Sequence, residues 1–419
     1  MVRPGNGTDV LFALRMLPGM RTGAGSNAFG LRLLYQARVQ RILLATLTGA
    51  FLLVRALQFL HFTSQTEWGF DLAFHWTANQ HVLAGESIYA PFQTAGPYPT
   101  RSVPFQYLYS PFMAVAVAPL AVVLADHRVA NWVWTGVGAT ILILVVSLVG
   151  GHKRRPGSRV DRALLVGLAF AFAPVTTELI LGNVHLLILG LLAGAWLAVE
   201  RKTPRGDITA GALIGVATLI KVFPGLVVIW FLLTRRFRAA IATGVTMAIL
   251  VVATLPVVGL RPWLEYPTVL LNLIPPTEVS FALAPSIWLS GLMPSPAAQV
   301  LVTVAGLGVV AWTTRRRSEP ISFAVAVAVS VLIAPALYPH YLTIMILPLV
   351  LALGHTRPAV WIALVFLAVS GGDGEGLGGA AWIVTRALPT LGALLVVFGL
   401  IWFGRRDVLV EPVRDPATA

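Results

Sequence analysis

The sequence predicts an all-α polytopic membrane protein. Of its 419 residues, 57% are apolar and only 11% are charged, whereas soluble domains carry about 25% charged residues. Mean hydropathy is +0.82. The apolar residues form continuous runs rather than the short alternating segments of a membrane barrel, and lipid tolerates only helices or closed barrels. The composition therefore excludes both a soluble domain and a disordered protein.

The apolar runs are numerous, but several are short. A full crossing takes about 20 residues, and some runs are interrupted by Pro or Gly, so we expect some short, tilted or re-entrant helices. In total we expect about 12 transmembrane helices and additional amphipathic helices on the outer face. The runs lie at about 42–62, 108–125, 130–151, 163–181, 184–199, 208–222, 224–234, 239–260, 297–313, 320–338, 341–354, 358–371 and 380–403.

The net charge of +13 is typical of nucleic-acid-binding proteins as well as of membrane proteins. Here the basic residues form short clusters between the apolar runs, which favours membrane topology and no nucleic-acid partner. The positive-inside rule places the clusters in the cytoplasm: 152–155 with 159 and 162, 201–205, 235–238, 315–317, 357 and 405–406. The intervening tips then face outward: 182–185, 222–223, 261–296, 339–340 and 371–379. If the N-terminus and residue 152 are both cytoplasmic, an even number of crossings separates them, but three apolar runs lie there. Either 108–125 lies in the membrane interface, as we expect, or the basic cluster at 152–162 departs from the positive-inside rule.

Three regions follow from this pattern. Residues 1–40 are basic, lack the features of a signal peptide, and are predicted to form a cytoplasmic arm. Residues 41–404 form a single transmembrane domain, and 405–419 form a cytoplasmic tail. Two outward segments, 63–107 and 261–296, are too long for simple turns and are rich in Trp, Tyr and Pro. We expect them to be ordered against the outer membrane face and to form a cavity there.

Asp71 opens the stretch that ends at Gly85, in which Leu72, Trp76 and Leu83 share one face at helical spacing. We predict a short amphipathic helix lying on the membrane, with Gly85 just after its end. The structural interpretation of Asp71 is an N-cap, where Asp is favoured. The functional interpretation is a base facing the outer cavity, and the two are compatible.

Other ionisable residues also lie near the outward tips. His340 is either an interfacial histidine bonded to backbone, or a proton carrier and hydrogen-bond donor to phosphate. Lys221 is the only Lys within an apolar run; it either snorkels to the interface or binds an anionic phosphate. Arg101 and Arg261 are further outward cations or simple anchors. His75 and His81 are six residues apart, which does not suit helical metal ligands. With no nucleotide-binding motif and no Cys, we expect no metal and no cofactor.

The order of these elements resembles glycosyltransferase family 87, the polyprenyl-phosphate-mannose-dependent α-1,2-mannosyltransferases of actinobacteria, which have the GT-C membrane fold. The resemblance covers about residues 42–350. Its pieces are Phe70-Asp71 after the first helix, Leu83-Ala-Gly-Glu-Ser-Ile-Tyr89, Tyr107-Leu-Tyr-Ser-Pro111, Gly182-Asn-Val-His185, Lys221-Val-Phe-Pro224 and Ala336-Leu-Tyr-Pro-His-Tyr341. In two places the chain departs from the family pattern: Tyr-Pro stands before His340 where Trp is common, and His185 replaces the usual amide.

The resemblance implies an inverting glycosyltransferase of the cell envelope. It would transfer mannose from polyprenyl-phosphate-mannose to a glycolipid or glycan at the outer face of the plasma membrane. Asp71 would be the base that deprotonates the acceptor hydroxyl, and His340 would assist catalysis. Lys221, Arg101 and Arg261 would bind the donor phosphate, while Asn183, His185, Glu86 and Tyr89 would bind sugar. The lipid tail would lie in a groove between helices of the bilayer-embedded domain.

Three alternatives remain from the sequence. An arabinofuranosyltransferase with a polyprenyl-phosphate donor would keep the enzyme class and change the sugar. A lipid-linked sugar flippase or transporter would change the class, but transporters often show internal repeats and mid-membrane charges. The sequence has no convincing repeat, and its polar candidates lie at outward tips. A purely structural scaffold would explain neither the aromatic outer segment nor the family elements.

Overall fold

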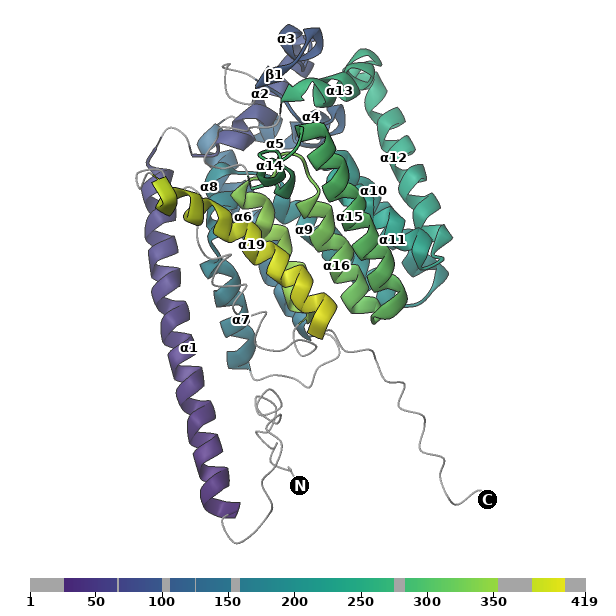
Figure 1. Ribbon diagram of the computed structural model, residues 1–419. Coiled ribbons are helices and arrows are strands. Elements are labelled where there is room, and N and C mark those ends of the chain that lie inside the picture. The colour runs from purple at the N-terminus through teal and green to yellow at the C-terminus, as the bar shows by residue number, and fades with distance from the viewer. Residues whose placement is uncertain are drawn as a thin grey trace, which may run out of the picture.

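The computed structural model describes residues 26–65, 68–99, 106–124, 126–151, 159–274, 283–352 and 379–403. The regular secondary structure in these ranges is helical apart from two short strands, and turns connect the elements. Figure 1 shows the helices gathered in a bundle, with α1 standing at its edge and α19 crossing the front at a slant. The first half of the bundle consists of α1 Ser26–Thr63, α4 Pro111–Ala116, α5 Ala118–Val123, α6 His127–Gly151, α7 Arg159–Ala171, α8 Ala173–Leu181, α9 His185–Glu200 and α10 Pro204–Ile220.

The second half continues with the same kind of element. A 3-10 turn precedes α11 and another precedes α17, so two of the apolar runs begin with a tight, irregular turn rather than with a regular helix. The elements are η2 Phe223–Leu226, α11 Val227–Leu233, α12 Phe237–Val258, α14 Pro285–Leu289, α15 Ser295–Arg316, α16 Glu319–Leu332, η3 Pro339–Met345, α17 Ile346–Ala352 and α19 Gly379–Phe403.

The chain is a multi-pass membrane protein. In the described part, four helical segments are long and apolar enough to cross a bilayer: Ile42–Thr63, His127–Gly150, Phe237–Val258 and Ser295–Arg316. A fifth span exists if α7 and α8, which are bent by 64°, count as one. The described residues thus hold four or five candidate spans together with shorter apolar helices, and the expected total of about 12 transmembrane helices stays a prediction. The predicted run at 358–371 lies outside the described residues.

Two physical reasons set the shorter apolar helices apart from these candidate spans. The shorter apolar helices have 10–17 residues, which corresponds to at most about 26 Å of helix, less than the ~30 Å hydrocarbon core. Some of these helices are also covered by protein rather than lipid. Residues 321–332 of α16, for example, are all buried. An apolar run in the sequence does not distinguish these two environments.

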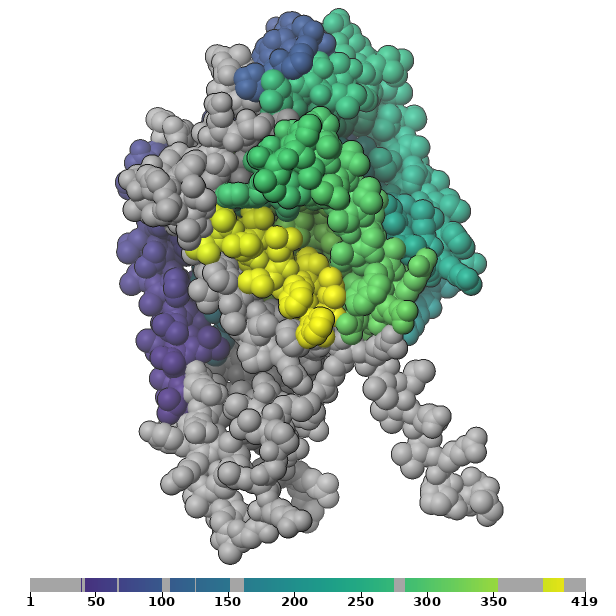
Figure 2. All heavy atoms as spheres, viewed as in Figure 1, coloured from purple at the N-terminus to yellow at the C-terminus, as the bar shows by residue number. Residues whose placement is uncertain are grey.

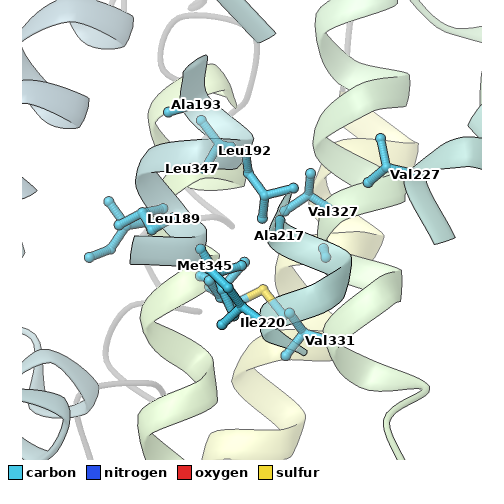
Figure 3. Packing of buried hydrophobic residues seen from close by; sticks show 14 of the residues in the cluster. Leu189, Leu192, Ala193, Ala217, Ile220, Val227, Val327, Val331, Met345 and Leu347 are labelled. Carbon is cyan, nitrogen blue, oxygen red and sulfur yellow. The ribbon is translucent and has the colours of Figure 1, made fainter. Parts of the chain in front are cut away.

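The core lies where α9, α10, α16 and α17 meet. Figure 3 shows Leu189 and Leu192 of α9 beside Ala217 and Ile220 of α10, with side chains of α16, η3 and α17 completing the cluster. Helices α9 and α10 are joined by a short turn at residues 201–203, so the basic cluster 201–205 lies at one end of this pair. The start of α9 and the end of α10 lie together at the other end. This arrangement brings His185 and Lys221 close in space.

A separate layer covers that end of the bundle (Figure 1). It consists of α2 Phe70–Ala84, α3 Pro91–Ala95, β1 Tyr98–Pro99, α13 Arg261–Asn272 and β2 Leu273–Ile274. The strands pair in parallel with Tyr98 opposite Leu273, and the Tyr98 hydroxyl donates to the carbonyl of Val269 at 2.7 Å. Figure 2 shows α3 and α13 in contact at the top of the molecule. The two long segments predicted to face outward are thus ordered against one another where they are described.

Helix α2 lies where the sequence predicted a short helix. Gly85 follows it with a positive φ of 70°, as expected of a C-terminal glycine. The residues buried in the protein are Leu72, His75, Ala78 and Asn79, whereas Leu83 is 66% exposed. The face that packs on the protein is therefore partly polar, and His75 contacts the rings of Tyr107 and Tyr109 there. That the helix lies on the membrane stays a prediction.

At the opposite end of α10, ion pairs hold three helices together. Arg236, just before α12, contacts the carboxylate of Asp207 on α10 at 2.6 Å and that of Glu319 on α16. Helix α1 begins at Ser26 and so includes residues 26–40 of the predicted arm. The rest of that arm and the predicted tail 405–419 lie outside the described residues.

Candidate active site

Asp71 lies in the first turn of α2 and points into the protein. The N-cap of this helix is Gly69, which has a positive φ of 76°, so the interpretation of Asp71 as an N-cap is wrong. Its carboxylate instead accepts a hydrogen bond from the side-chain amide of Asn183. Burial raises the pKa of the Asp71 carboxyl, while the charge of Lys221 and the Asn183 hydrogen bond oppose that rise. A carboxylate in this state is suited to accept a proton.

Asn183 holds two predicted catalytic residues together. Its Nδ2 contacts Asp71 and also lies 3.2 Å from Nε2 of His340. Its Oδ1 accepts from the Val184 backbone N–H at 2.7 Å and from the Tyr109 hydroxyl at 3.2 Å. Because the oxygen faces two donors, the amide nitrogen faces Asp71 and His340 as the donor. His340 Nε2 is then an acceptor in this arrangement.

Every hydrogen-bonding group of the Asn183 side chain is therefore engaged within the protein. The sequence assigned this residue to sugar binding by resemblance. In the structure it orients the Asp71 carboxylate and the His340 ring, and it is only 5% exposed. An orienting role fits these contacts directly, whereas a bound sugar would need Asn183 to give up one of them.

A second set of polar side chains, centred on Lys221, lies beside the set formed by Asp71, Asn183 and His340. Lys221 follows the end of α10, and its Nζ lies 3.1 Å from Nε2 of His185. The same ammonium lies 4.0 Å from the ring centroid of Tyr341 and 5.1 Å from that of Tyr109. Burial lowers the pKa of Lys221 to about 7, and the charges of Asp71 and Glu178 oppose this effect. The neighbours of the Lys221 ammonium are thus the His185 imidazole and two tyrosine rings.

Glu178 was not among the residues that the sequence singled out for function. It lies in α8, is 1% exposed, and contacts Nδ1 of His185 at 3.0 Å. The signal available in the sequence was a carboxylate inside an apolar run, seven residues before His185, because an ionisable group in such a run usually has a partner or a function. Both ring nitrogens of His185 are occupied by Glu178 and Lys221, and His185 has no exposed surface.

The remaining predicted site residues lie elsewhere or outside the description. Tyr89 is buried and donates from its hydroxyl to the carbonyl of Tyr109 at 2.8 Å, so it supports the site wall. Glu86 is exposed beyond the far end of α2 and lies 3.9 Å from His81. Arg261 is exposed and pairs with Glu265 at 2.6 Å. Arg101 lies outside the described residues.

An apolar cavity of about 540 Å³ borders this cluster. Its walls come from α4, α6, α9 and α10, and include Met113, Leu144, Leu187, Gly190, Val216 and Ile220. Two lining residues adjoin the polar cluster: Ile220 directly precedes Lys221, and Nε1 of Trp134 donates to the carbonyl of Asn183 at 2.9 Å. Leu144 lines the cavity and is 50% exposed, so the cavity opens sideways on the surface of α6, which is one of the candidate membrane spans.

The geometry joins two carboxylates, two histidines and an ammonium from distant parts of the chain near an apolar cavity. Residues 107–339 match the family described as Glycosyltransferase family 87. No curated protein and no solved structure matches the chain. The matched segment is more than half of the chain and contains Glu178, Asn183, His185 and Lys221. The chain therefore belongs to glycosyltransferase family 87, a GT-C family, and is a glycosyltransferase.

Proposed function

We propose that this glycosyltransferase transfers mannose from polyprenyl-phosphate-mannose to a glycolipid or polysaccharide acceptor at the outer face of the plasma membrane. The observation that carries the proposal is the meeting of Asp71, His340 and Lys221 next to residues that line an apolar cavity, Ile220 and Trp134. A lipid phosphate sugar has the matching parts, since it combines an apolar tail, one anionic phosphate and a sugar. The cavity suits the tail and the ammonium suits the phosphate.

In the proposed mechanism Asp71 is the general base. Its carboxylate takes the proton from an acceptor hydroxyl as the hydroxyl oxygen forms a bond to the anomeric carbon. The bond between that carbon and the phosphate oxygen breaks at the same time, so the configuration inverts. The departing isoprenyl phosphate carries both electrons of the broken bond and gains negative charge. It needs charge stabilisation rather than protonation, and the Lys221 ammonium is placed to supply it.

His340 has a supporting part in this scheme. Its Nε2 faces the amide of Asn183, which also holds Asp71. The ring stacks at 5.7 Å on Tyr338 and lies 5.1 Å from His185. These contacts hold the imidazole between the base and the ammonium, where it can donate from Nδ1 to the donor phosphate or to the sugar.

The position of the basic clusters supports an outer-face site. Residues 201–205 lie at the start of α10, whereas Lys221 follows its end, about 26 Å away along the helix axis. The positive-inside rule places the basic end in the cytoplasm. The cluster around Asp71 is then on the extracytoplasmic side, where a lipid-linked donor and an envelope acceptor would meet.

The test is sugar transfer by the purified full-length protein in lipid nanodiscs. We would supply polyprenyl-phosphate-[¹⁴C]mannose and a glycolipid extract, and digest the product with an exo-α-mannosidase. Wild type should yield a labelled product that the α-mannosidase cleaves. Asp71→Asn should lower the rate by about 10²–10⁴-fold, the usual contribution of a general base. Glu265→Gln, a half-buried carboxylate of α13 changed in the same way, should retain the wild-type rate.

Three results would overturn parts of the proposal. If Asp71→Asn were as active as wild type, Asp71 would not be the base. If wild type were inactive with the mannosyl donor but active with polyprenyl-phosphate-arabinofuranose, the sugar would be wrong and the enzyme class would stand. If the protein moved the intact lipid-linked sugar across the bilayer without transfer, the site would instead belong to a flippase.

A further inference from the structure

Glu178 and His185 form a buried chain of hydrogen bonds that ends on the Lys221 ammonium. The contacts are 3.0 Å from Glu178 Oε2 to His185 Nδ1 and 3.1 Å from His185 Nε2 to Lys221 Nζ. Glu178 is 1% exposed and His185 is fully buried. The mechanism above uses only the last member of this chain, so the first two members require their own explanation.

Glu178 itself is fixed by the start of α9. Its Oε1 accepts from the backbone N–H groups of His185 at 2.5 Å and Leu186 at 3.2 Å. These are N–H groups of the first turn of a helix, which lack partners within that helix and favour a negative charge. The carboxylate is therefore anchored by two backbone donors before it meets the imidazole.

The anchored carboxylate determines which nitrogen of His185 carries the proton. With Glu178 ionised, its carboxylate only accepts, and Nδ1 of His185 is the donor. In the neutral ring Nε2 is then an acceptor, and Lys221 donates to it. The ring is also held between Tyr341 at 4.2 Å and Phe223 at 6.2 Å. The imidazole is thus fixed in both position and tautomer.

The fixed imidazole in turn restricts the position of the Lys221 ammonium, which its flexible four-carbon stem would otherwise leave free to vary. One of its three N–H groups is directed to His185, and its charge lies over the Tyr341 ring. Among the described residues no other hydrogen-bond partner of this ammonium is found, so two N–H groups can donate to an anion that approaches it. A donor that is held in place before substrate arrives needs little rearrangement during the reaction.

We propose that Glu178 and His185 are positioning residues that hold the Lys221 ammonium for the phosphate of an isoprenyl monophosphate. The inference rests on the proposed function for its substrate class. It assigns to Glu178 a role beyond capping α9, and to His185 a role other than contact with sugar. A purely structural cap would affect folding, whereas a positioning residue should affect phosphate affinity through Lys221 alone.

Glu178→Gln is the sharpest variant. The amide oxygen can still accept from the first turn of α9, but the NH₂ group would face His185 Nδ1. The imidazole proton would then move to Nε2 and point at the ammonium, placing two donors opposite each other. We expect binding of farnesyl phosphate to weaken by about tenfold or more, the size expected for losing a hydrogen bond to a charged group. His185→Phe retains the ring stacking and should show the same loss.

The decisive measurement is a double-mutant cycle with Lys221→Met. We would measure the Kd of farnesyl phosphate for the full-length protein in nanodiscs, with farnesol as the probe that lacks phosphate. In the Lys221→Met background, Glu178→Gln should have no further effect, and farnesol should bind all variants equally. Glu265→Gln should match wild type. Thermal melting of each variant reports folding, and His185→Phe carries the same cycle if Glu178→Gln does not fold.

The outcomes separate this inference from the proposed function. Wild-type affinity in Glu178→Gln, or an equal loss with and without Lys221, would overturn the positioning role. Failure of wild type to bind farnesyl phosphate more tightly than farnesol would overturn it as well. If phosphate binding depended on all three residues while no sugar transfer occurred, the positioning role would stand and the proposed function would fail.

Discussion

The side-chain amide of Asn183 donates a hydrogen bond to the carboxylate of Asp71 across 112 residues of sequence. The same amide nitrogen lies 3.2 Å from His340. One side chain at the turn before α9 therefore fixes the relative positions of the proposed base and the proposed assisting histidine. Its loss should change the acidity of Asp71 as well as its position.

Asn183→Ala should shift the acid side of the pH profile upward. The Asn183 hydrogen bond opposes the burial that raises the pKa of Asp71, so its removal raises that pKa further. Asp71 acts as a base only when it is ionised, so kcat/KM should then reach its plateau at higher pH than in wild type. Because a hydrogen bond to a charged group contributes about 1.5–3 kcal/mol, the rate near the acid limb should fall by about tenfold or more.

The matched control for this variant is Asn79→Ala. Asn79 is also buried and lies on α2, and its Nδ2 contacts the carbonyl of Ala114 at 3.4 Å. Removing the Asn79 side chain should leave the acid limb of the kcat/KM pH profile at its wild-type pH, whatever the substitution does to stability. An identical acid limb in wild type and Asn183→Ala would contradict the role assigned to Asn183.

Lys221 should set the alkaline side of the profile. Its pKa is lowered to about 7, and it binds phosphate only as the ammonium. The value of kcat/KM for the lipid donor should therefore fall as the pH rises above about 7, because kcat/KM reports the free enzyme. Lys221→Arg should remove this decline, since a guanidinium stays charged, although its different shape should lower the plateau. An unchanged alkaline limb in Lys221→Arg would assign the limb to another group.

The apolar cavity should select for the tail of the donor. Val216 lines it, and Val216→Phe would fill part of its volume. Displacing about two tail carbons at ~0.8 kcal/mol each should raise the KM of a decaprenyl-phosphate donor by about tenfold. A citronellyl-phosphate donor, with only two isoprene units, should be affected much less. Val245→Phe on the exposed face of α12 is the control, and an equal effect of both variants would place the tail elsewhere.

The position of α2 depends on Gly69. This glycine has a positive φ, and an added Cβ would lie 2.0 Å from the side chain of Asn131. Gly69→Ala should therefore displace the start of α2 together with Asp71, and lower both the melting temperature and kcat. Gly85→Ala is the matched control, because Gly85 also has a positive φ but no atom lies within 4 Å of an added Cβ. Gly85→Ala should cost about 1 kcal/mol of stability and leave kcat unchanged. If the two variants behaved alike, close packing at Gly69 would not matter.

The helical class of the protein, the end of α2 at Gly85, and the residues around the turns at 182–185 and 221–224 could be predicted from sequence. Hydropathy and turn chemistry are local properties, and they act at these positions without help from the rest of the chain. The number of spans could not be obtained in this way. Apolar residues of α16 are enclosed by protein, and a run enclosed by protein has the same composition as one enclosed by lipid.

The sequence by itself determined that the chain is a membrane protein and made Asp71, Lys221 and His340 candidates for function, because charge is scarce in an apolar chain. Only the tertiary structure decided that Asp71 is not a helix cap, that Asn183 joins it to His340, and that Glu178 reaches Lys221 through His185. These relationships join residues up to 157 positions apart. They depend on how the helix ends meet, and the packing of side chains across the whole bundle sets that meeting.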